Sequence, residues 1–398
     1  MHIQKLEIEN IRCIEKLTMQ FPENPAGWHV LIGENGSGKS TILKAMAATL
    51  LKTANHITPI WNSWLRKDAQ EGNIILAIQK SDDDRNSDAA NTPTFNTHLK
   101  IKKNQPSEKE RDITKYGGNG WFSMSFGVNR SFSSEDKDTE NHHTNAHLSL
   151  LEEEYRFSKI TSWLKNLYQR NGKLGWIKTI LNTELLPNGI TFVGVKEVEN
   201  SDDLKVVFEK EEQELGLMDL SDGYRSVLIL TLEIIRQVKH FFPDDNYVFG
   251  NIKKGEMNFP ISGVILIDEI DAHLHPTWQV KIGEWFTKYF PNIQFIVTTH
   301  SPLICRAIGE KGTIWKVENG GAREITGIEK LRLRYGNILE AYDTFGGALS
   351  TSKEAKKLRN RLAQLNIRSI QGKITSEEEA EREDLRTFFP TKYDTVAE

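Results

Sequence analysis

Residues 33–40 read Gly-Glu-Asn-Gly-Ser-Gly-Lys-Ser and fit the phosphate-binding pattern G-x-x-x-x-G-K-S/T. Glycines let consecutive backbone N–H groups close around phosphate oxygens, and the amino end of the following helix adds positive potential. We therefore expect Lys39 to reach the β- and γ-phosphates and Ser40 to bind Mg²⁺, which makes ATP and Mg²⁺ the predicted cofactors. The residues predicted to contact the nucleotide in this loop are Gly33, Asn35, Gly36, Ser37, Gly38, Lys39, Ser40 and Thr41.

A second cluster follows the strongly apolar segment 261–267, which ends in Asp268 and Glu269. Ligands of parallel sheets bind at the carboxyl ends of the strands, so acidic residues there are candidates for chemistry. Asp268 is predicted to hold Mg²⁺, and Glu269 to orient or deprotonate the attacking water. The alternative is a strand that ends in solvated acids, and the phosphate-binding loop elsewhere in the chain argues against it.

The elements that must position these residues follow a strand–loop–helix order. An apolar strand at 28–32 precedes the loop, and a helix at 41–51 follows it with Ile42, Leu43, Met46 and Leu50 on its inner face. The alternative to a phosphate-binding loop is a glycine-rich turn that arose by chance, and such a turn need not lie between a strand and a helix. The other predicted strands are 2–9, 16–21, 74–78, 98–101, 190–195, 205–209, 294–298, 313–317 and 322–325.

Helical patterns occupy much of the second half of the chain. We predict helices within 148–186, broken near Gly172 and Gly175, and at 224–242 and 278–290. In the tail, one helix covers 351–371, and a second begins at Thr375 and Ser376 with a capping-box pattern. The polar segment 81–96 is expected to be a mobile surface loop.

Composition limits the function classes. The chain has 398 residues, a net charge of −4 and two cysteines, Cys13 and Cys305, without metal-ligand spacing. No global basic field recruits nucleic acid, although the basic segment 353–368 leaves it as a candidate partner beside the favoured interpretation of a solvated helix face. The cysteines suit a reducing cytosol. No signal-peptide core or apolar run of ~20 residues occurs, so we expect a cytoplasmic protein without a membrane partner.

Two further segments resemble motifs of the ABC ATPases. Residues 220–226, Leu-Ser-Asp-Gly-Tyr-Arg-Ser, resemble the signature motif at the start of a long helix, and residues 297–302 resemble the switch-histidine segment. In that family the signature of one subunit caps the ATP held by the other. The resemblance implies that Ser221 and Gly223 contact the γ-phosphate in trans, that His300 senses it in cis, and that the chain forms a homodimer around ATP. Glu269, Lys39 and His300 are then the predicted catalytic residues.

The branch of the family is narrowed by three other segments. Residues 8–12, Ile-Glu-Asn-Ile-Arg, resemble the start of RecF- and SMC-like ATPases, where the arginine reaches the nucleotide, which implies that role for Arg12. Residues 268–276 are similar to OLD-like ATPases, and residues 126–130 loosely match a Tyr-Gly-Pro-x-Arg element of their relatives. Tyr224 follows the signature where transporter ATPases usually carry glutamine. Gln79 and Gln105 are alternative candidates for the Q-loop.

His273 and His275 are predicted to serve structure or dimer contact, with metal ligation as the disfavoured alternative.

The predicted architecture is an α/β ABC-ATPase fold with a mixed central sheet and flanking helices. Residues 1–325 form the ATPase domain with a helical insertion at about 135–188, and residues 326–398 form a helical C-terminal extension.

The resemblance implies a slow, regulatory ATPase of bacterial anti-phage defence, similar to the ATPase subunits of Septu, retron-linked and PARIS systems. Such a subunit controls a separate nuclease or toxin. The alternative is a RecF-like DNA-repair clamp, which would bind duplex DNA with an affinity that falls steeply with salt.

Overall fold

The computed structural model describes residues 1–51, 62–81, 94–104, 108–110, 122–130, 142–152, 159–171, 174–183, 185–186, 189–198, 204–242, 258–336, 341–342, 344 and 353–388. The chain divides into two compact units, Met1–Ala341 and Tyr342–Glu398. The predictions for the polar segment 81–96 and for Gln105 and Gly172 lie wholly or mostly outside the described residues.

The central sheet of the first unit has the strand order β14-β13-β3-β12-β11-β7. Neighbouring strands from β13 to β7 run parallel, whereas β14 closes the sheet as an antiparallel hairpin with β13. The mixed central sheet is therefore confirmed. The strands are β3 (Gly27–Ile32), β7 (Phe122–Phe126), β11 (Gly263–Ile267), β12 (Ile293–Thr299), β13 (Ile314–Glu318) and β14 (Gly321–Ile325).

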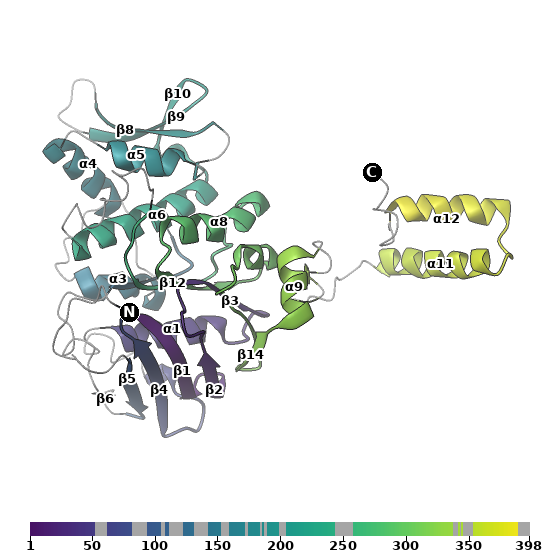
Figure 1. Cartoon of the computed structure of the whole chain (residues 1–398), viewed down its shortest axis with the longest axis horizontal. Helices are drawn as coiled ribbons and strands as arrows, with labels where there is room; N and C mark the ends of the chain where they lie inside the picture. The colour runs from purple at the N-terminus through teal and green to yellow at the C-terminus, as the bar shows by residue number, and fades with distance from the viewer. Residues whose placement is uncertain are drawn as a thin grey trace. The chain divides into compact units, whose positions relative to one another are not determined.

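One face of this sheet is covered by α1 (Lys39–Leu50), on whose other side lies an antiparallel sheet of order β2-β1-β4-β5-β6 (Figure 1). A continuous apolar core joins these layers, since Val264, Leu266 and Ile296 of the central sheet pack with α1 and with the antiparallel strands. The strands are β1 (His2–Ile11), β2 (Ile14–Gln20), β4 (Glu71–Gln79), β5 (Thr94–Lys102) and β6 (Glu108–Glu110).

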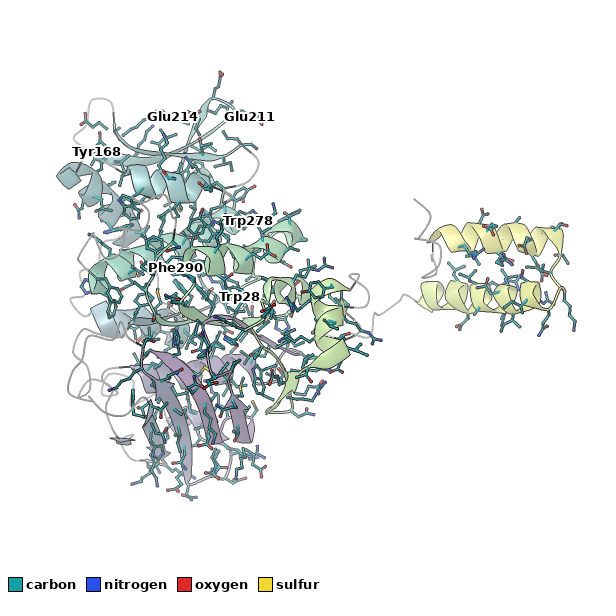
Figure 2. The ribbon with its side chains drawn as sticks, viewed as in Figure 1. Trp28, Tyr168, Glu211, Glu214, Trp278 and Phe290 are labelled. Carbon is teal, nitrogen blue, oxygen red and sulfur yellow. The ribbon has the colours of Figure 1, made fainter. Side chains whose placement is uncertain are left out.

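The opposite face of the central sheet packs on α6 (Asp222–Phe241) and α8 (Pro276–Tyr289). Aromatic rings fill this layer: Trp28 of β3 stacks on Phe286 with ring centroids 6.3 Å apart, and Phe259 stacks on Phe290 at 4.9 Å. Figure 2 shows Trp28 and Phe290 between the sheet and the helices. The aromatic residues of 278–290 are thus part of the core.

A further layer lies beyond α6. It consists of α4 (Lys159–Asn171), α5 (Gly175–Asn182) and an antiparallel sheet of order β10-β9-β8, with β8 at Thr191–Glu197, β9 at Leu204–Lys210 and β10 at Gln213–Gly216 (Figure 1). The break between α4 and α5 matches the prediction. The inserted layer is mixed α/β, whereas α3 (His142–Leu151) packs on α1 and β7 as part of the main body.

The first unit continues beyond the predicted boundary at residue 325. Helix α9 (Gly327–Tyr335) packs on the 3-10 segment Pro302–Ala307, and Lys330 donates a hydrogen bond to the carbonyl of Gly312, 2.7 Å away. These contacts hold α9 on the first unit, so the boundary falls after Ala341.

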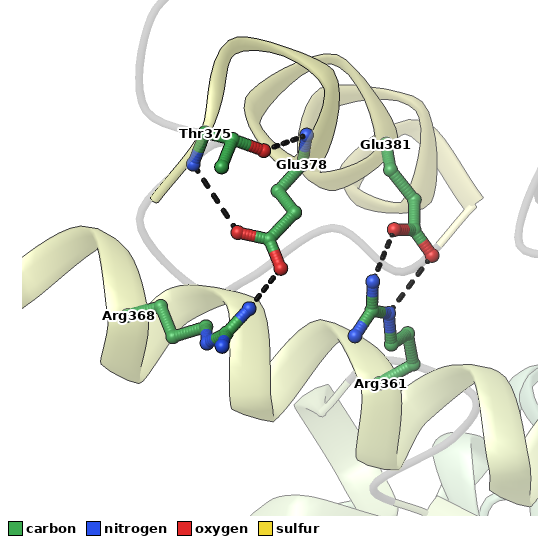
Figure 3. A network of polar contacts seen from close by, with 5 residues as sticks. All are labelled: Arg361, Arg368, Thr375, Glu378 and Glu381. Carbon is green, nitrogen blue, oxygen red and sulfur yellow. Dashed lines mark hydrogen bonds and ion pairs between the residues drawn. The ribbon is translucent and has the colours of Figure 1, made fainter. Parts of the chain in front are cut away.

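The second unit contains a helical hairpin of α11 (Lys353–Ile370) and α12 (Ser376–Phe388). Leu362, Leu365 and Leu385 form its small core. The Thr375 hydroxyl accepts from the Glu378 N–H at 3.2 Å, and the Glu378 carboxylate accepts from the Thr375 N–H at 3.2 Å (Figure 3). This reciprocal pair is the capping box that the sequence predicted.

Basic residues of α11 are paired with acidic residues of α12. The Arg361 guanidinium donates to both oxygens of Glu381, at 3.0 and 2.7 Å, and Arg368 pairs with Glu378 (Figure 3). These two arginines therefore face the partner helix of the hairpin, and the interpretation of the rest of the basic segment as a solvated helix face stays a prediction.

Candidate functional site

Four adjacent strands of the central sheet end at one edge, and each is followed by a predicted functional segment. The phosphate-binding loop follows β3, His300 follows β12, Asp268 and Glu269 follow β11, and residues 127–130 follow β7. Because these strands are parallel neighbours, their carboxyl ends lie side by side. The fold thus gathers most of the predicted site on one edge.

The loop before α1 requires glycine at specific positions. Gly33 has φ of 156°, and a Cβ atom there would lie 2.3 Å from the carbonyl oxygen of Val317. Gly38 has φ of 113° and forms the left-handed N-cap of α1, and a Cβ atom there would lie 3.1 Å from the Cys13 sulfur. Gly36, with φ of 76°, shares the left-handed region. Glycine-rich turns of this kind can present backbone N–H groups to a phosphate anion.

Two polar groups of the loop fit a phosphate ligand. The Ser37 hydroxyl is buried and makes no hydrogen bond among the described residues. The Lys39 ammonium donates to the carbonyls of Gly33 and Glu34, both at 2.8 Å, so it lies at the mouth of the loop. Burial lowers the pKa of Lys39, and the nearby carboxylate of Asp268 opposes this shift. A buried cation and an unpaired hydroxyl are suited to a phosphate anion.

The two predicted Mg²⁺ ligands lie together. The Ser40 hydroxyl donates to the Asp268 carboxylate at 3.0 Å, although 228 residues separate them in sequence. These hard oxygen donors, together with phosphate oxygens and waters, are the ligands that Mg²⁺ prefers. The donor set therefore fits Mg²⁺ bound with a nucleotide.

Thr298 of β12 connects the two acidic residues. Its hydroxyl donates to the Asp268 carboxylate at 2.5 Å and accepts from the backbone N–H of Glu269 at 2.7 Å. Glu269 itself has φ of 45°, a left-handed conformation that is unusual for a glutamate. The hydroxyl of Thr298 thus bonds both to the predicted Mg²⁺-binding carboxylate and to the backbone of the predicted catalytic residue.

The backbone of His300 is held by Asp271, which lies in the segment after β11. The Thr299 hydroxyl donates to the Asp271 carboxylate at 2.5 Å, and the backbone N–H of His300 donates to the same carboxylate at 3.3 Å. Asp271 follows Glu269 by two residues, so the switch segment is linked to the acidic segment through this carboxylate. This leaves the half-buried imidazole of His300 at the strand edge.

Arg12 lies in the turn between β1 and β2, with φ of 49°. Its backbone N–H donates to the carbonyl of Trp64 at 2.7 Å, and its guanidinium lies 5.1 Å from the Trp64 ring centroid. The next residue, Cys13, lies against Gly38 of the phosphate-binding loop. Arg12 is therefore exposed and next in sequence to a residue that contacts the loop, and its role at the nucleotide stays a prediction.

The signature residues have a different environment. Ser221 is the N-cap of α6, is exposed, and makes no capping hydrogen bond through its side chain. A Cβ atom at Gly223 would lie 2.6 Å from the carbonyl of His273, and Arg225 pairs with Asp222 and donates to the Met218 carbonyl. The described polar contacts of this segment therefore go to residues near 218 and 273 and to Arg130, not to the phosphate-binding loop.

The structure argues against Gln79 as the Q-loop residue. It ends β4 opposite His2 at the start of β1, whereas Arg12 follows the other end of β1. Because an extended strand as long as β1 spans about 30 Å, Gln79 lies far from the phosphate-binding loop. Its amide oxygen instead accepts from Gln4 at 2.5 Å.

His275 is the N-cap of α8, where its ring accepts from the Thr277 N–H at 3.4 Å, and the carbonyl of His273 packs against Gly223. The capping bond gives His275 a structural role, whereas the role of the exposed His273 side chain in structure or dimer contact stays a prediction.

Three residues that bond to the predicted site residues were given no role by the sequence: Thr298, Asp271 and Arg130. Each lies in a segment that the sequence singled out, but none had a predicted role of its own. Each acts through tertiary hydrogen bonds, which single-sequence patterns do not encode. The only signal for Arg130 was the loose match of residues 126–130 to the Tyr-Gly-Pro-x-Arg element.

Comparison with known families covers both halves of the site. The family described as "AAA ATPase domain" matches residues 1–147, and the family described as "AAA domain, putative AbiEii toxin, Type IV TA system" matches residues 185–306. The structure of an SMC head bound to the C-winged helix domain of ScpA superposes with a TM-score of 0.50 and 16% identity, and covers 83% of this chain and 99% of that chain. This likeness concerns the fold alone.

Both matching family models describe AAA-type domains, and together with the fold and the motifs they support an ATPase of the ABC type. Within it, the chain is similar to a Septu protein PtuA of Bacillus mycoides (strain KBAB4), 27% identical over 372 residues. It is also similar to a "Retron Ec83 probable ATPase" of Escherichia coli, 39% identical over 118 residues.

The Septu match covers 90% of this chain and 46% of the relative, and the retron match covers 29% and 20%. The chain thus spans less than half the length of either relative.

Among the described residues, no helix is both long and apolar enough to span a membrane.

Proposed function

We propose that this chain is a sensor or regulatory ATPase that dimerises around ATP and controls a separate nuclease or toxin subunit in anti-phage defence. Hydrolysis in this proposal is slow and serves to switch the assembly state. Nucleotide binding shifts the equilibrium between separate and joined subunits, and hydrolysis reverses the shift.

The observation that carries the proposal is the division of the site. Lys39, Ser40, Asp268 and Glu269 lie on one strand edge, whereas Ser221 is exposed at the start of α6 without a capping hydrogen bond from its side chain. A helix N-terminus with an exposed hydroxyl is suited to a phosphate that comes from outside the chain. A second copy would bring that phosphate with its own nucleotide, so the site supports a symmetric dimer with two composite sites.

In each composite site the residues have separate tasks. Lys39 and the loop amides bind the phosphates, and Ser40 with Asp268 would hold Mg²⁺, which supplies charge neutralisation when bound. Glu269 orients the attacking water and accepts its proton. His300 contacts the γ-phosphate region from the same chain, and Ser221 with Gly223 does so from the partner.

The defence role rests on similarity to a Septu protein and a retron ATPase, and it implies an effector subunit. A pull-down tests it directly. Tagged Glu269→Gln protein, purified from its native host with ATP and Mg²⁺, should retain ATP and hold the closed assembly together with a stoichiometric nuclease or toxin-like protein. The control is Lys39→Ala, which should not bind ATP and should not retain the closed assembly. Recovery of duplex DNA without a protein partner would contradict the defence role and support a DNA clamp.

A further inference from the structure

A single buried arginine touches both the acidic segment and the signature helix. Arg130 lies in the loop after β7, is only 8% exposed and uses all three of its nitrogens as donors. Its second terminal nitrogen donates to the backbone carbonyls of Asp268 and, at 2.8 Å, Glu269. The other terminal nitrogen donates to the Ser226 hydroxyl at 3.2 Å, and Nε donates to the Gly127 carbonyl at 3.2 Å.

The contact with Glu269 addresses a conformational difficulty. A glutamate with φ of 45° is disfavoured, because its Cβ crowds the backbone, so neighbours must hold it there. The N–H of that residue is held by Thr298. Its carbonyl oxygen accepts from Arg130 and from the Ala272 N–H at 2.9 Å. Arg130 therefore holds the carbonyls of both peptide groups that flank the Glu269 Cα, whereas Thr298 holds only the N–H before it.

The contact with Ser226 extends this clamp to α6. Ser226 is buried, one turn inside the helix that begins at the exposed N-cap Ser221. Between them, Gly223 packs against the carbonyl of His273 so closely that a Cβ there would lie 2.6 Å from it. Residues 269–273 and the first turns of α6 are thus joined at two points.

From these contacts we propose that Arg130 is a positioning residue, which holds Glu269 in its strained conformation and ties it to the signature helix. Glu269 acts on the nucleotide of its own chain, and Ser221 acts on the nucleotide of the partner. Arg130 therefore fixes the geometry of one half-site relative to the other within each subunit. This inference rests on the proposed function for its catalytic consequence, but the positioning itself does not depend on ATP hydrolysis.

The guanidinium is suited to this task and an ammonium is not. Arg130 is planar and presents its donors in a fixed fork toward backbone carbonyls and one hydroxyl at once. Although burial lowers its pKa to about 10, Arg130 stays charged at neutral pH. Arg130→Lys keeps the charge but loses the fork, and Arg130→Met loses both.

The test measures turnover, ATP affinity and backbone amide exchange of four variants beside the wild type. Arg130→Met should lower kcat at least about tenfold while the Kd for ATP stays within about threefold, since only the water-positioning group is displaced. Amide exchange across residues 269–275 should become at least about tenfold faster. Arg130→Lys should recover part of both effects.

Ser226→Ala keeps the carbonyl contacts of Arg130 and removes the link to α6. It should speed amide exchange in the first turns of α6 and leave residues 269–271 protected. Arg323→Lys, on an exposed ion pair with Glu329, is the matched control and should match the wild type throughout.

Unchanged exchange across 269–275 in Arg130→Met would overturn the proposal. So would parallel losses in kcat and ATP affinity with a lowered Tm, because general destabilisation then accounts for them. Failure of the wild type to hydrolyse ATP would instead contradict the proposed function, and the exchange data would still decide the role of Arg130.

Discussion

Thr298 offers a sharp perturbation of the acidic segment, because one hydroxyl makes two hydrogen bonds there. Thr298→Val has the same shape and removes both, the 2.5 Å bond to Asp268 and the 2.7 Å bond from the Glu269 N–H. A bond to a charged group contributes about 1.5–3 kcal/mol, and an unsatisfied buried N–H costs about 1–3 kcal/mol. Since the Glu269 N–H is only partly buried, we expect a loss of about 2–4 kcal/mol in the free energy of unfolding.

The matched control is Thr49→Val. Thr49 is as fully buried, but its hydroxyl makes a single bond to the carbonyl of Ala45, four residues earlier in α1, at 2.8 Å. That carbonyl also lies within the hydrogen-bond pattern of the helix, so the loss should stay below about 1 kcal/mol. Urea unfolding of both variants, followed by fluorescence, measures the difference.

ATP turnover supplies an independent readout for Thr298→Val. Because Thr298→Val removes one hydrogen bond from Asp268 and one from the Glu269 backbone, its kcat should fall at least about tenfold, whereas the kcat of Thr49→Val should be unchanged. Equal stability losses in the two variants, or unchanged turnover in Thr298→Val, would refute the reasoning that Thr298 organises the acidic segment.

Three other predictions concern separate parts of the chain. Burial lowers the pKa of His29 to about 4, so the unfolded chain binds a proton near pH 6.5 that the folded chain does not. The free energy of unfolding should therefore fall by about 3 kcal/mol through His29 as the pH drops from 6.5 to 4. Urea titrations of His29→Gln at these two pH values should lack this part of the loss. Gly33→Ala should abolish binding of fluorescent ATP, since its Cβ would meet the Val317 carbonyl, and unaltered binding would contradict this. Thr375→Ala should destabilise the C-terminal hairpin by about 1 kcal/mol in calorimetry, without altering ATP turnover.

Local motifs made most of the site predictable from sequence. The phosphate-binding loop is recognisable because its glycine spacing, preceding strand and following helix are all contiguous. Asp268 was equally predictable from sequence, because an apolar strand followed by acidic residues, in a chain that also has a phosphate-binding loop, indicates a metal-binding carboxylate. The structure confirms that Ser40 and Asp268 meet.

Residues that act through distant partners were not predictable in the same way. Arg130 bonds to residues 96 and 138 positions away, and no periodicity encodes such a contact. The sequence left Gln79 as a Q-loop candidate because it does not show in which direction β4 runs. In the structure Gln79 pairs with His2, at the end of β1 that is far from the phosphate-binding loop. The strand β10 was missed because its sequence, QELG, has neither alternation nor β-branched residues.

The central claim is that each nucleotide site needs two chains, and mixing two inactive variants tests it most directly. Lys39→Ala has an intact signature, and Ser221→Arg has an intact phosphate-binding loop. Each alone should hydrolyse ATP at only a few per cent of the wild-type rate.

Their 1:1 mixture, with heterodimers verified by two affinity tags, contains one complete site in every heterodimer. It should recover about a quarter of wild-type turnover if the two sites of a symmetric dimer act independently. Verified heterodimers that recover no turnover, or a Ser221→Arg variant that hydrolyses ATP normally alone, would contradict a site completed in trans.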